Sequence, residues 1–255
     1  MSQQANPFYY NTPEWYKGGE PAFYDAKSFP ISEVLLEHQP TFKEEALGLF
    51  SRQPTSFQQN FSPYNTDLKG WRTIVLFSYG LINKKNIEKF PKTWEVLKDI
   101  EGLSLLMFSV LQPQTHLKAH FGDTDAIVRH HIGLHVPAPH PSIALRVCQE
   151  ERGWSEKEVM SFCVVNRHQA WNKTDEPRLI LMSDTIKPEF AHRKAEVWSK
   201  VLGAEATKYY SNKWPWTKCF PISLTRLIHW SGSLFIRGVI LWHKFRYRSI
   251  YPGKG

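Results

Sequence analysis

Histidine is unevenly distributed along this chain of 255 residues. Seven of the eleven histidines lie in one stretch: His116, His120, His130, His131, His135, His140 and His168. Neutral imidazole is a common ligand of iron and zinc, so the cluster indicates a metal site. The alternative is a group of separate buried or exposed histidines without a common function, and composition alone favours that alternative.

One segment of this stretch separates polar from apolar side chains. Over 127–136 two sets of residues alternate: Arg129, His131, Gly133 and His135 against Val128, Ile132, Leu134 and Val136. Because successive residues of a strand point to opposite faces, the segment predicts a strand with one aliphatic face. The other face then lines a polar pocket or meets solvent, and parity alone does not distinguish the two.

The elements that must hold these residues are predicted to be short strands. β-rich runs separated by turn-forming segments occur at 103–111, 127–136, 143–147, 159–165 and 178–183. No helix-length pattern lies between them, which favours a mainly β antiparallel sandwich or jelly roll. Helical spacing appears at 32–52, 92–100 and 188–209. We therefore expect an irregular and helical flank over 1–101, a β core over 102–187 and a helical extension over 188–255.

Four motifs follow one another inside the predicted β core. They are His-x-Gly at 120–122, Arg-x-His at 129–131, Gly-Leu-x-Val-Pro at 133–137 and His-x-x-Trp-Asn-x-Thr-Asp-x-x-Arg at 168–178. In this order and spacing the stretch 100–190 resembles the aspartyl/asparaginyl β-hydroxylase family of Fe(II)- and 2-oxoglutarate-dependent oxygenases. The resemblance implies a double-stranded β-helix, which is a cupin-like jelly roll, with iron inside it.

The resemblance also implies roles for individual residues. His120 and His168 match the catalytic iron ligands, and Gly122 stands where other such oxygenases carry a carboxylate ligand. Arg178, with Ser109 as its hydrogen-bonding helper, matches the arginine for the distal carboxylate of 2-oxoglutarate. Arg129 and His131 match the pair for the carboxylate beside the keto group. The implied reaction couples oxidative decarboxylation of 2-oxoglutarate by O₂ to hydroxylation of an aliphatic carbon.

Two positions depart from the family pattern. Many members carry consecutive acidic residues where this chain has Cys163 and Val164. Many also carry a further arginine where this chain has Ile127. An arginine there would suit an acidic substrate side chain, so its replacement weakens the expectation of a peptidyl aspartate substrate.

The positive charge of the chain lies in its last fifth. The net charge is +8, yet after Glu205 there are nine Lys and Arg and no Asp or Glu, so residues 1–205 carry −1. If 222–246 is helical, Arg226, His229, Ser233, Arg237 and Lys244 share a face opposite aliphatic and tryptophan residues. This pattern fits either peripheral membrane contact through 222–248 or a helix packed on the body of the protein.

Three cysteines without a C-x-x-C spacing favour a reducing compartment, and no signal peptide is visible, so we expect a cytoplasmic protein, and the tail leaves peripheral membrane contact open as one of its two interpretations. The leading hypothesis is a dioxygenase that hydroxylates the β-carbon of an Asp, an Asn or a related amino-acid residue, in a peptide or on a carrier. The alternatives are a hydroxylase of a lipid-linked acyl chain and a catalytically silent jelly roll that binds a partner. A nearly neutral body without a recognition motif argues against nucleic acid.

Overall fold

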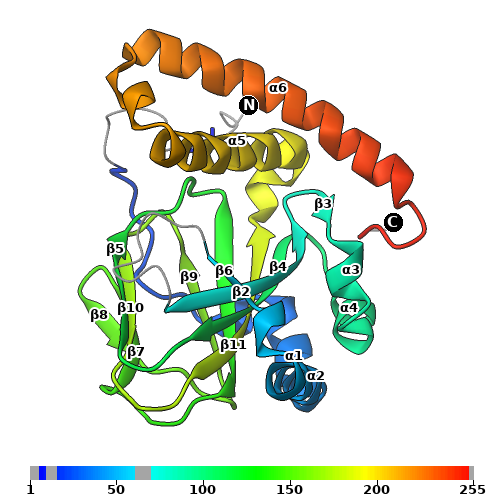
Figure 1. Cartoon of the computed structure of the whole chain (residues 1–255), viewed down its shortest axis with the longest axis vertical. Helices are drawn as coiled ribbons and strands as arrows, with labels where there is room; N and C mark the ends of the chain where they lie inside the picture. Colours follow the sequence, from blue (N-terminus) through cyan, green and yellow to red (C-terminus); the bar gives the residue numbers. More distant parts are fainter. Residues whose placement is uncertain (1–5, 10–15, 61–69, 253–255) are drawn as a thin grey trace.

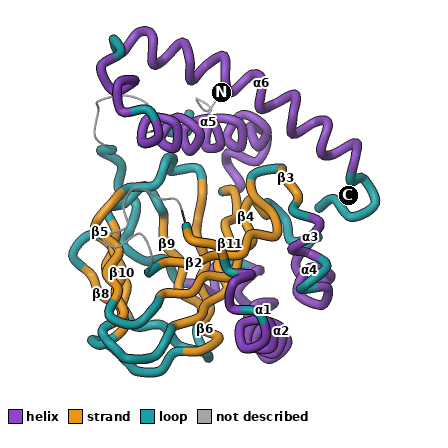
Figure 2. The backbone as a smooth tube through the Cα atoms, in the orientation of Figure 1, coloured by secondary structure: helices purple, strands orange, loops and turns teal. Residues whose placement is uncertain are grey.

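The computed structural model describes residues 6–9, 16–60 and 70–252. Two antiparallel sheets face each other, and a pair of long helices lies across one end of them (Figure 1). Figure 2 shows the same arrangement as strands below and helices above and to one side.

The larger sheet has the strand order β1-β2-β4-β11-β6-β9, with β3 paired to β2. Its strands are β1 (Gln58–Gln59), β2 (Trp71–Ser78), β3 (Leu81–Ile82), β4 (Leu103–Leu111), β6 (Ile127–His135), β9 (Val159–Cys163) and β11 (Arg178–Ile186). Every residue of β4 and β11 is buried, since both faces of these central strands are covered. This explains their continuous apolar sequences.

The smaller sheet has the order β5-β10-β7-β8. Its strands are β5 (Thr115–His120), β7 (Ile143–Val147), β8 (Glu150–Arg152) and β10 (His168–Asn172). Leu117, Leu145 and Ala170 of this sheet line the same interior space as Ile180 and Met182 of the larger one. The space between the sheets is therefore where the polar residues of the motifs meet.

Short helices cover the outer face of the larger sheet. They are α1 (Pro30–Glu37), α2 (Gln39–Arg52), α3 (Lys84–Ile87) and α4 (Pro91–Leu97). Proline opens α1 and α4, where its missing N–H costs no helical hydrogen bond. The Gln39 amide donates to the carbonyl of Gly133 at 2.9 Å and so ties α2 to β6. Arg129 and His131, on the other face of β6, line the space between the sheets, so the face with Val128, Ile132 and Leu134 is the one that the helices cover.

A helical hairpin follows the last strand. After a 3₁₀ turn at Pro188–Arg193 come α5 (Lys194–Lys213), the 3₁₀ helix η4 (Pro215–Cys219) and α6 (Ile222–Arg246). The two long helices approach closely at Gly203, where an added Cβ would lie 2.8 Å from Ser233 Oγ. Gly203 therefore sets the distance between α5 and α6.

The expected mainly β jelly roll with helices at both ends is confirmed, and the helix expected at 222–246 forms with those bounds. The expectation of an irregular and helical flank over 1–101 was incomplete, since β2 lies inside the larger sheet beside β4. The division at 101 and 187 stays a prediction. Among the described residues, no helix is both long and apolar enough to cross a bilayer.

Candidate active site

Two histidines face each other across the smaller sheet. His120 ends β5 and His168 begins β10, and the two residues are direct partners in the antiparallel ladder. Their ring centroids lie 4.2 Å apart. Side chains of direct cross-strand partners are neighbours, so strand register brings together residues that are far apart in the chain.

The hydrogen bonds of both rings select the same tautomer. Nδ1 of His120 lies 2.8 Å from the carbonyl oxygen of Lys118, and Nδ1 of His168 lies 2.8 Å from that of Asn166. A carbonyl only accepts, so each Nδ1 carries the proton and the lone pair of the neutral ring is on Nε2. Burial lowers the pKa of His120 to about 4 and that of His168 well below its ordinary value. Both rings are therefore neutral at pH 7, as metal ligation requires.

Gly122 packs against Val164, the residue that follows β9, so closely that no side chain fits at position 122. Its N–H donates to the Val164 carbonyl at 2.6 Å, and an added Cβ would lie 2.6 Å from Val164 Cβ. A carboxylate side chain at position 122 is thus excluded sterically. Consistently, no group of three or more His, Cys, Asp or Glu side chains in the described part of the chain is arranged to hold a metal ion.

A small inner chamber of about 30 Å³ opens beside the histidine pair. It is lined by His120, His168 and, among others, Ser109, Arg129, His131 and Arg178, so it brings together all six residues singled out in the sequence. Ser109 and Arg178 come from the paired strands β4 and β11, and Ser109 Oγ accepts from Trp71 Nε1 at 2.9 Å. Its own hydroxyl proton is then available for donation.

Arg178 carries a charge that no carboxylate of the described chain neutralises. Its residue is 2% exposed, and its Nε and Nη1 have no hydrogen-bond partner. The Trp154 ring lies 4.3 Å from the guanidinium carbon, and burial lowers the pKa of Arg178 to about 9. An unpaired buried cation is unfavourable, so the chamber is suited to an anion.

His131 presents a second unused donor to this chamber. Trp154 Nε1 donates to His131 Nδ1 at 3.2 Å, which places the ring proton on Nε2. That Nε2 is buried and has no partner. Burial, followed by the charges of Arg129 and Arg178, holds the pKa of His131 well below its usual value. The ring is therefore a neutral donor at pH 7.

Arg129 is held differently from Arg178. Its Nε and Nη2 donate to the two oxygens of Asp184 at 2.7 and 2.8 Å, and Asp184 is the direct partner of Arg129 in the ladder between β6 and β11. Tyr79 also donates to Asp184, at 2.7 Å. Arg129 thus reaches the chamber with a fixed orientation and an already compensated charge.

An outer chamber of about 330 Å³ shares Trp71, His120, Arg129 and His168 with the inner one. Apolar side chains supply most of its exposed wall surface, among them Val75, Leu105, Met107, Ile127, Val164, Val201 and Leu202, and Asp123, Glu205 and Lys208 add charged groups at one side. Val201 and Leu202 belong to α5, so the helical extension closes one side of the chamber. A substrate carbon brought near the histidine pair would lie among aliphatic side chains.

A cluster of three charged residues lies where α5 contacts the β core. Lys208 Nζ lies 2.6 Å from Asp123 Oδ1 and 3.1 Å from Glu205 Oε1. Burial raises the pKa of Asp123 to about 7. Asp123 is thus engaged by Lys208 of α5.

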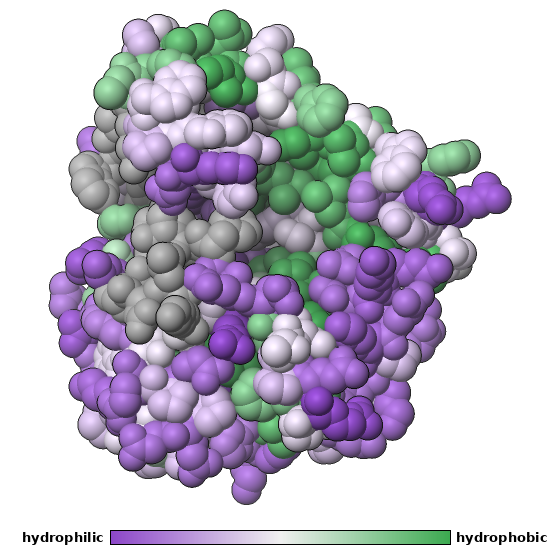
Figure 3. All heavy atoms as spheres, in the orientation of Figure 1, coloured by the Kyte–Doolittle hydropathy of each residue, from purple (hydrophilic) through white to green (hydrophobic). Residues whose placement is uncertain are grey.

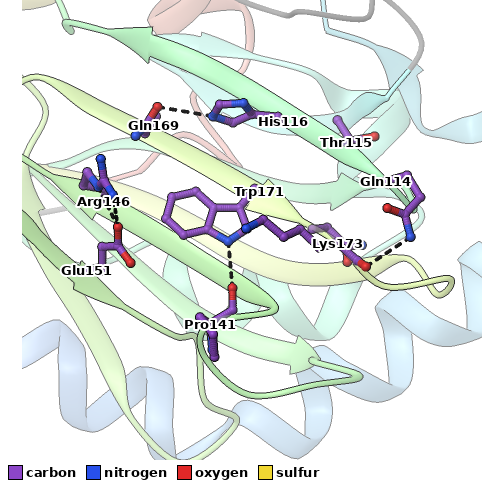
Figure 4. A pocket seen from close by; sticks show the side chains of 10 residues that line it. Gln114, Thr115, His116, Pro141, Arg146, Glu151, Gln169, Trp171 and Lys173 are labelled. Atoms are coloured by element: carbon purple, nitrogen blue, oxygen red, sulfur yellow. Dashed lines mark hydrogen bonds and ion pairs between the residues drawn. The ribbon is translucent and has the colours of Figure 1, made fainter.

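Other motif residues serve the scaffold. Asn172 donates to the carbonyls of Leu111 and Glu176, which joins β10 to neighbouring turns. Figure 4 shows Trp171 on the outer surface of the smaller sheet, where its Nε1 donates to the Pro141 carbonyl at 2.8 Å. Both residues act in packing. His130 is a core histidine between the hydroxyls of Ser161 and Thr185.

The family model for aspartyl/asparaginyl β-hydroxylases matches residues 37–188. The chain belongs to this family. The matched segment contains every residue that lines the two chambers except those of α5. The sequence motifs and the geometry of the chambers therefore indicate the same residues.

Several relatives of known name are similar to it. An ornithine lipid ester-linked acyl 2-hydroxylase of Rhizobium tropici is 34% identical over 181 residues, which are 69% of this chain and 64% of that protein. The aspartyl/asparaginyl β-hydroxylase of Mus musculus is 28% identical over 152 residues, 57% of this chain and 19% of that protein. This chain thus spans less than two thirds of either relative. A prolyl-4-hydroxylase structure from Pseudomonas putida aligns with a TM-score of 0.43 and 12% identity over 61% of this chain and 90% of that one.

The sequence did not reveal several residues of the site. Trp71 and Trp154 line the chambers, Asp184 and Tyr79 hold Arg129, and α5 supplies a wall. Strand parity could have found Asp184, which lies on the same face of β11 as Arg178. The tryptophans and α5 are brought in by tertiary packing, for which no local pattern exists.

Proposed function

We propose that the protein is an Fe(II)- and 2-oxoglutarate-dependent hydroxylase that acts on the acyl chain of a lipid. One observation carries the oxygenase part of this proposal. The inner chamber combines two neutral imidazoles with unprotonated Nε2 atoms and two buried, unpartnered donors, on His131 and Arg178. Such a donor set fits a metal ion together with a small anionic cosubstrate.

The metal would be held by Nε2 of His120 and of His168. Their backbone hydrogen bonds fix the ring orientation before the ion arrives, which is the usual way in which a surrounding shell positions ligands. Two neutral ligands leave several coordination positions for cosubstrates. When bound, Fe(II) supplies the activation of O₂, and 2-oxoglutarate supplies two electrons as it is converted to succinate and CO₂.

The chain's own donors account for both ends of 2-oxoglutarate. Arg178 and Ser109 would bind the distal carboxylate, and a fork of guanidinium N–H groups suits a carboxylate well. His131 and Arg129 would bind the carboxylate beside the keto group. In this arrangement the orphaned atoms of Arg178 and His131 gain partners, which favours cosubstrate binding in the buried chamber.

The outer chamber supports a lipid substrate over a peptidyl aspartate. Its exposed lining surface is mainly apolar, with Ile127 at the position where an arginine would meet an acidic side chain. Its described cations, Arg129 and Lys208, are each paired with carboxylates of the chain. An acidic substrate would have to compete with those pairs, whereas an acyl chain would not. The Rhizobium tropici relative is named for hydroxylating a lipid acyl chain.

Succinate formation tests the proposal. Protein purified anaerobically and loaded with Fe(II) is given 2-oxoglutarate and O₂, with either a detergent-dispersed ester-linked acyl lipid or an aspartate-containing peptide. We expect the lipid to stimulate succinate release and to gain one hydroxyl per succinate. His120→Ala and His168→Ala should abolish turnover, and His140→Ala, at an exposed histidine outside both chambers, should retain it.

Each other outcome selects a different function. Stimulation by the peptide alone would restore the hypothesis of an Asp or Asn β-carbon substrate. Failure of the metal-loaded protein to bind 2-oxoglutarate in calorimetry would leave a catalytically silent jelly roll.

A further inference from the structure

Exposed large apolar side chains are concentrated in the helical hairpin. Of the fourteen such residues in the described part of the chain, thirteen lie between Tyr209 and Phe245, and the other is Leu36. Single exposed apolar residues are normal on a protein surface, but a contiguous group marks an interaction site. Figure 3 shows apolar side chains gathered over the hairpin, above a β body whose visible surface is mostly hydrophilic.

The orientation of α6 explains this concentration. The helix faces the body with residues spaced three and four apart: His229, Ser233, Ile236, Ile240, His243 and, just beyond its end, Tyr247. His229 Nε2 lies 3.2 Å from the Lys200 carbonyl oxygen, and Ile240 is buried. The side turned away from α5 therefore carries the aliphatic and aromatic residues.

These outward residues form what we call the apolar ridge: Leu224, Leu227, Ile228, Leu234, Phe235, Leu241, Trp242 and Phe245. Phe235 and Phe245 are each 74% exposed. The ridge extends along a helix of 25 residues, or roughly 37 Å at the α-helical rise. Its orientation corrects one expectation from the sequence, since His229 and Ser233 do not join the cations on an exposed face.

Exposed cations accompany the apolar ridge. Arg226, Arg237 and Lys244 recur along one flank of α6, and Arg246 and Arg248 follow at its end. No acidic residue occurs after Glu205. An apolar helix face edged by Lys and Arg is the composition of a helix that lies in the interface of an anionic membrane.

The turn between the two helices adds aromatic surface beside the ridge. A hollow of about 420 Å³ is walled there mainly by apolar atoms of α5, η4 and α6, including Tyr210, Trp214 and Trp216. Trp216 is 63% exposed. Tryptophan is favoured at bilayer interfaces because its ring is apolar and its N–H can reach water.

We propose that the hairpin docks the protein on an anionic lipid surface, with the apolar ridge in the interfacial region and α6 parallel to the membrane plane. The α5 side of the same hairpin lines the outer chamber, so docking holds that chamber near the lipid. This proposal goes beyond the catalytic one and does not depend on it.

A second copy of the chain is a poorer occupant of this face. In a twofold dimer the same patch serves both partners, so the cations beside one ridge would meet those beside the other. Like charges at such an interface repel, whereas phosphate groups of lipid headgroups neutralise them. The charge of the tail thus favours lipid over self-association.

Vesicle sedimentation of the full chain, without iron or 2-oxoglutarate, tests the docking. We expect the protein to pellet with phosphatidylcholine vesicles that contain 30% phosphatidylglycerol and to remain largely in solution with pure phosphatidylcholine. The triple variant Phe235→Ser, Leu241→Ser, Phe245→Ser should partition at least tenfold less. These side chains are exposed, so their loss leaves the core intact, which circular dichroism verifies. Leu36→Ser, an exposed apolar residue of α1, is the matched control and should pellet as the wild type does.

Cation variants separate the two contributions. Replacing Arg226, Lys244 and Arg246 by Gln should weaken binding to the anionic vesicles at least fivefold, and the same change at Lys27, Arg52 and Lys85 should not. Wild-type protein that stays in solution with both vesicles overturns the proposal, as does wild-type partition of the Ser triple variant. A dimer that the Ser variant dissociates in the absence of lipid would also overturn it. A His120→Ala variant that still pellets, and a Ser variant that still oxidises a detergent-dispersed substrate, distinguish docking from catalysis.

Discussion

Gly122 and Val164 lie so close together that the backbone of one fills the space a side chain of the other would need. The Gly122 N–H donates to the Val164 carbonyl, and an added Cβ would lie 2.8 Å from that oxygen. His120 stands two residues before Gly122, so the close approach also positions the end of β5.

Gly122→Ala should therefore lower the free energy of unfolding by about 1–3 kcal/mol, because the backbone of 122 and 164 must separate. Affinity for Fe(II), measured anaerobically by calorimetry, should fall with it. Gly48→Ala is the matched control: its Cβ would meet only Arg52 Nη2, at 3.6 Å, and helix propensity predicts a gain of up to about 1 kcal/mol. A Gly122→Ala variant as stable as the wild type in urea would contradict the steric argument.

Arg178→Met should have opposite effects on the apoprotein and on cosubstrate binding. Removal of an unpaired buried charge should leave the apoprotein at least as stable as the wild type. A 100-fold excess of 2-oxoglutarate over its Kd should stabilise the Fe(II)-loaded wild type by about 2.7 kcal/mol and the variant by almost nothing. Arg52→Met, at an exposed arginine, is the control for loss of a cation. Equal stabilisation of both proteins by 2-oxoglutarate in thermal unfolding would remove Arg178 from the binding site.

The pairing of Arg129 with Asp184 predicts a strong coupling energy. Asp184 is fully buried, so Asp184→Asn leaves a largely buried guanidinium without its counter-charge and should cost about 3 kcal/mol. The double variant Arg129→Met, Asp184→Asn should lose less than the sum of the two single variants, since no charge is then left alone. Urea unfolding of the four proteins measures this difference, and simple additivity would show that the pair contributes little.

The buried, neutral His130 should make the free energy of unfolding smaller in mild acid. Burial lowers its pKa to about 4, whereas an unfolded histidine titrates near 6.5. Between these values the unfolded chain binds a proton that the folded one does not, so stability decreases as the pH falls from about 6.5 to about 4. For this residue the loss at pH 5 relative to pH 8 is about 2 kcal/mol. His130→Gln should reduce the pH dependence of the unfolding free energy by that amount, and an unchanged dependence would assign it to other groups.

The parts of the fold that were predictable are those with strong local patterns. The continuous apolar runs of β4 and β11 and the three- and four-residue spacing in α6 need no tertiary information. β5 and β10 were not expected as strands, because they are short and carry polar residues at many positions. Their register nevertheless decides the site, since it pairs His120 with His168.

The packing of α6 shows a different limit of sequence reasoning. Helical spacing grouped His229 and Ser233 with the cations Arg226 and Lys244. In the structure α5 provides His229 with a carbonyl oxygen, and Gly203 leaves room for Ser233, so both turn inward. Only the neighbouring helix determines which polar residues become buried.

The imidazoles of His120 and His168 are oriented by carbonyl oxygens of the main chain, each two residues earlier. The backbone of each strand end therefore takes a direct part in orienting its ring. Substitutions on the walls, such as Ile127 or the residues of α5, can change what enters the outer chamber without disturbing the two nitrogens. The shape of the outer chamber and the positions of the two nitrogens thus depend largely on different parts of the chain.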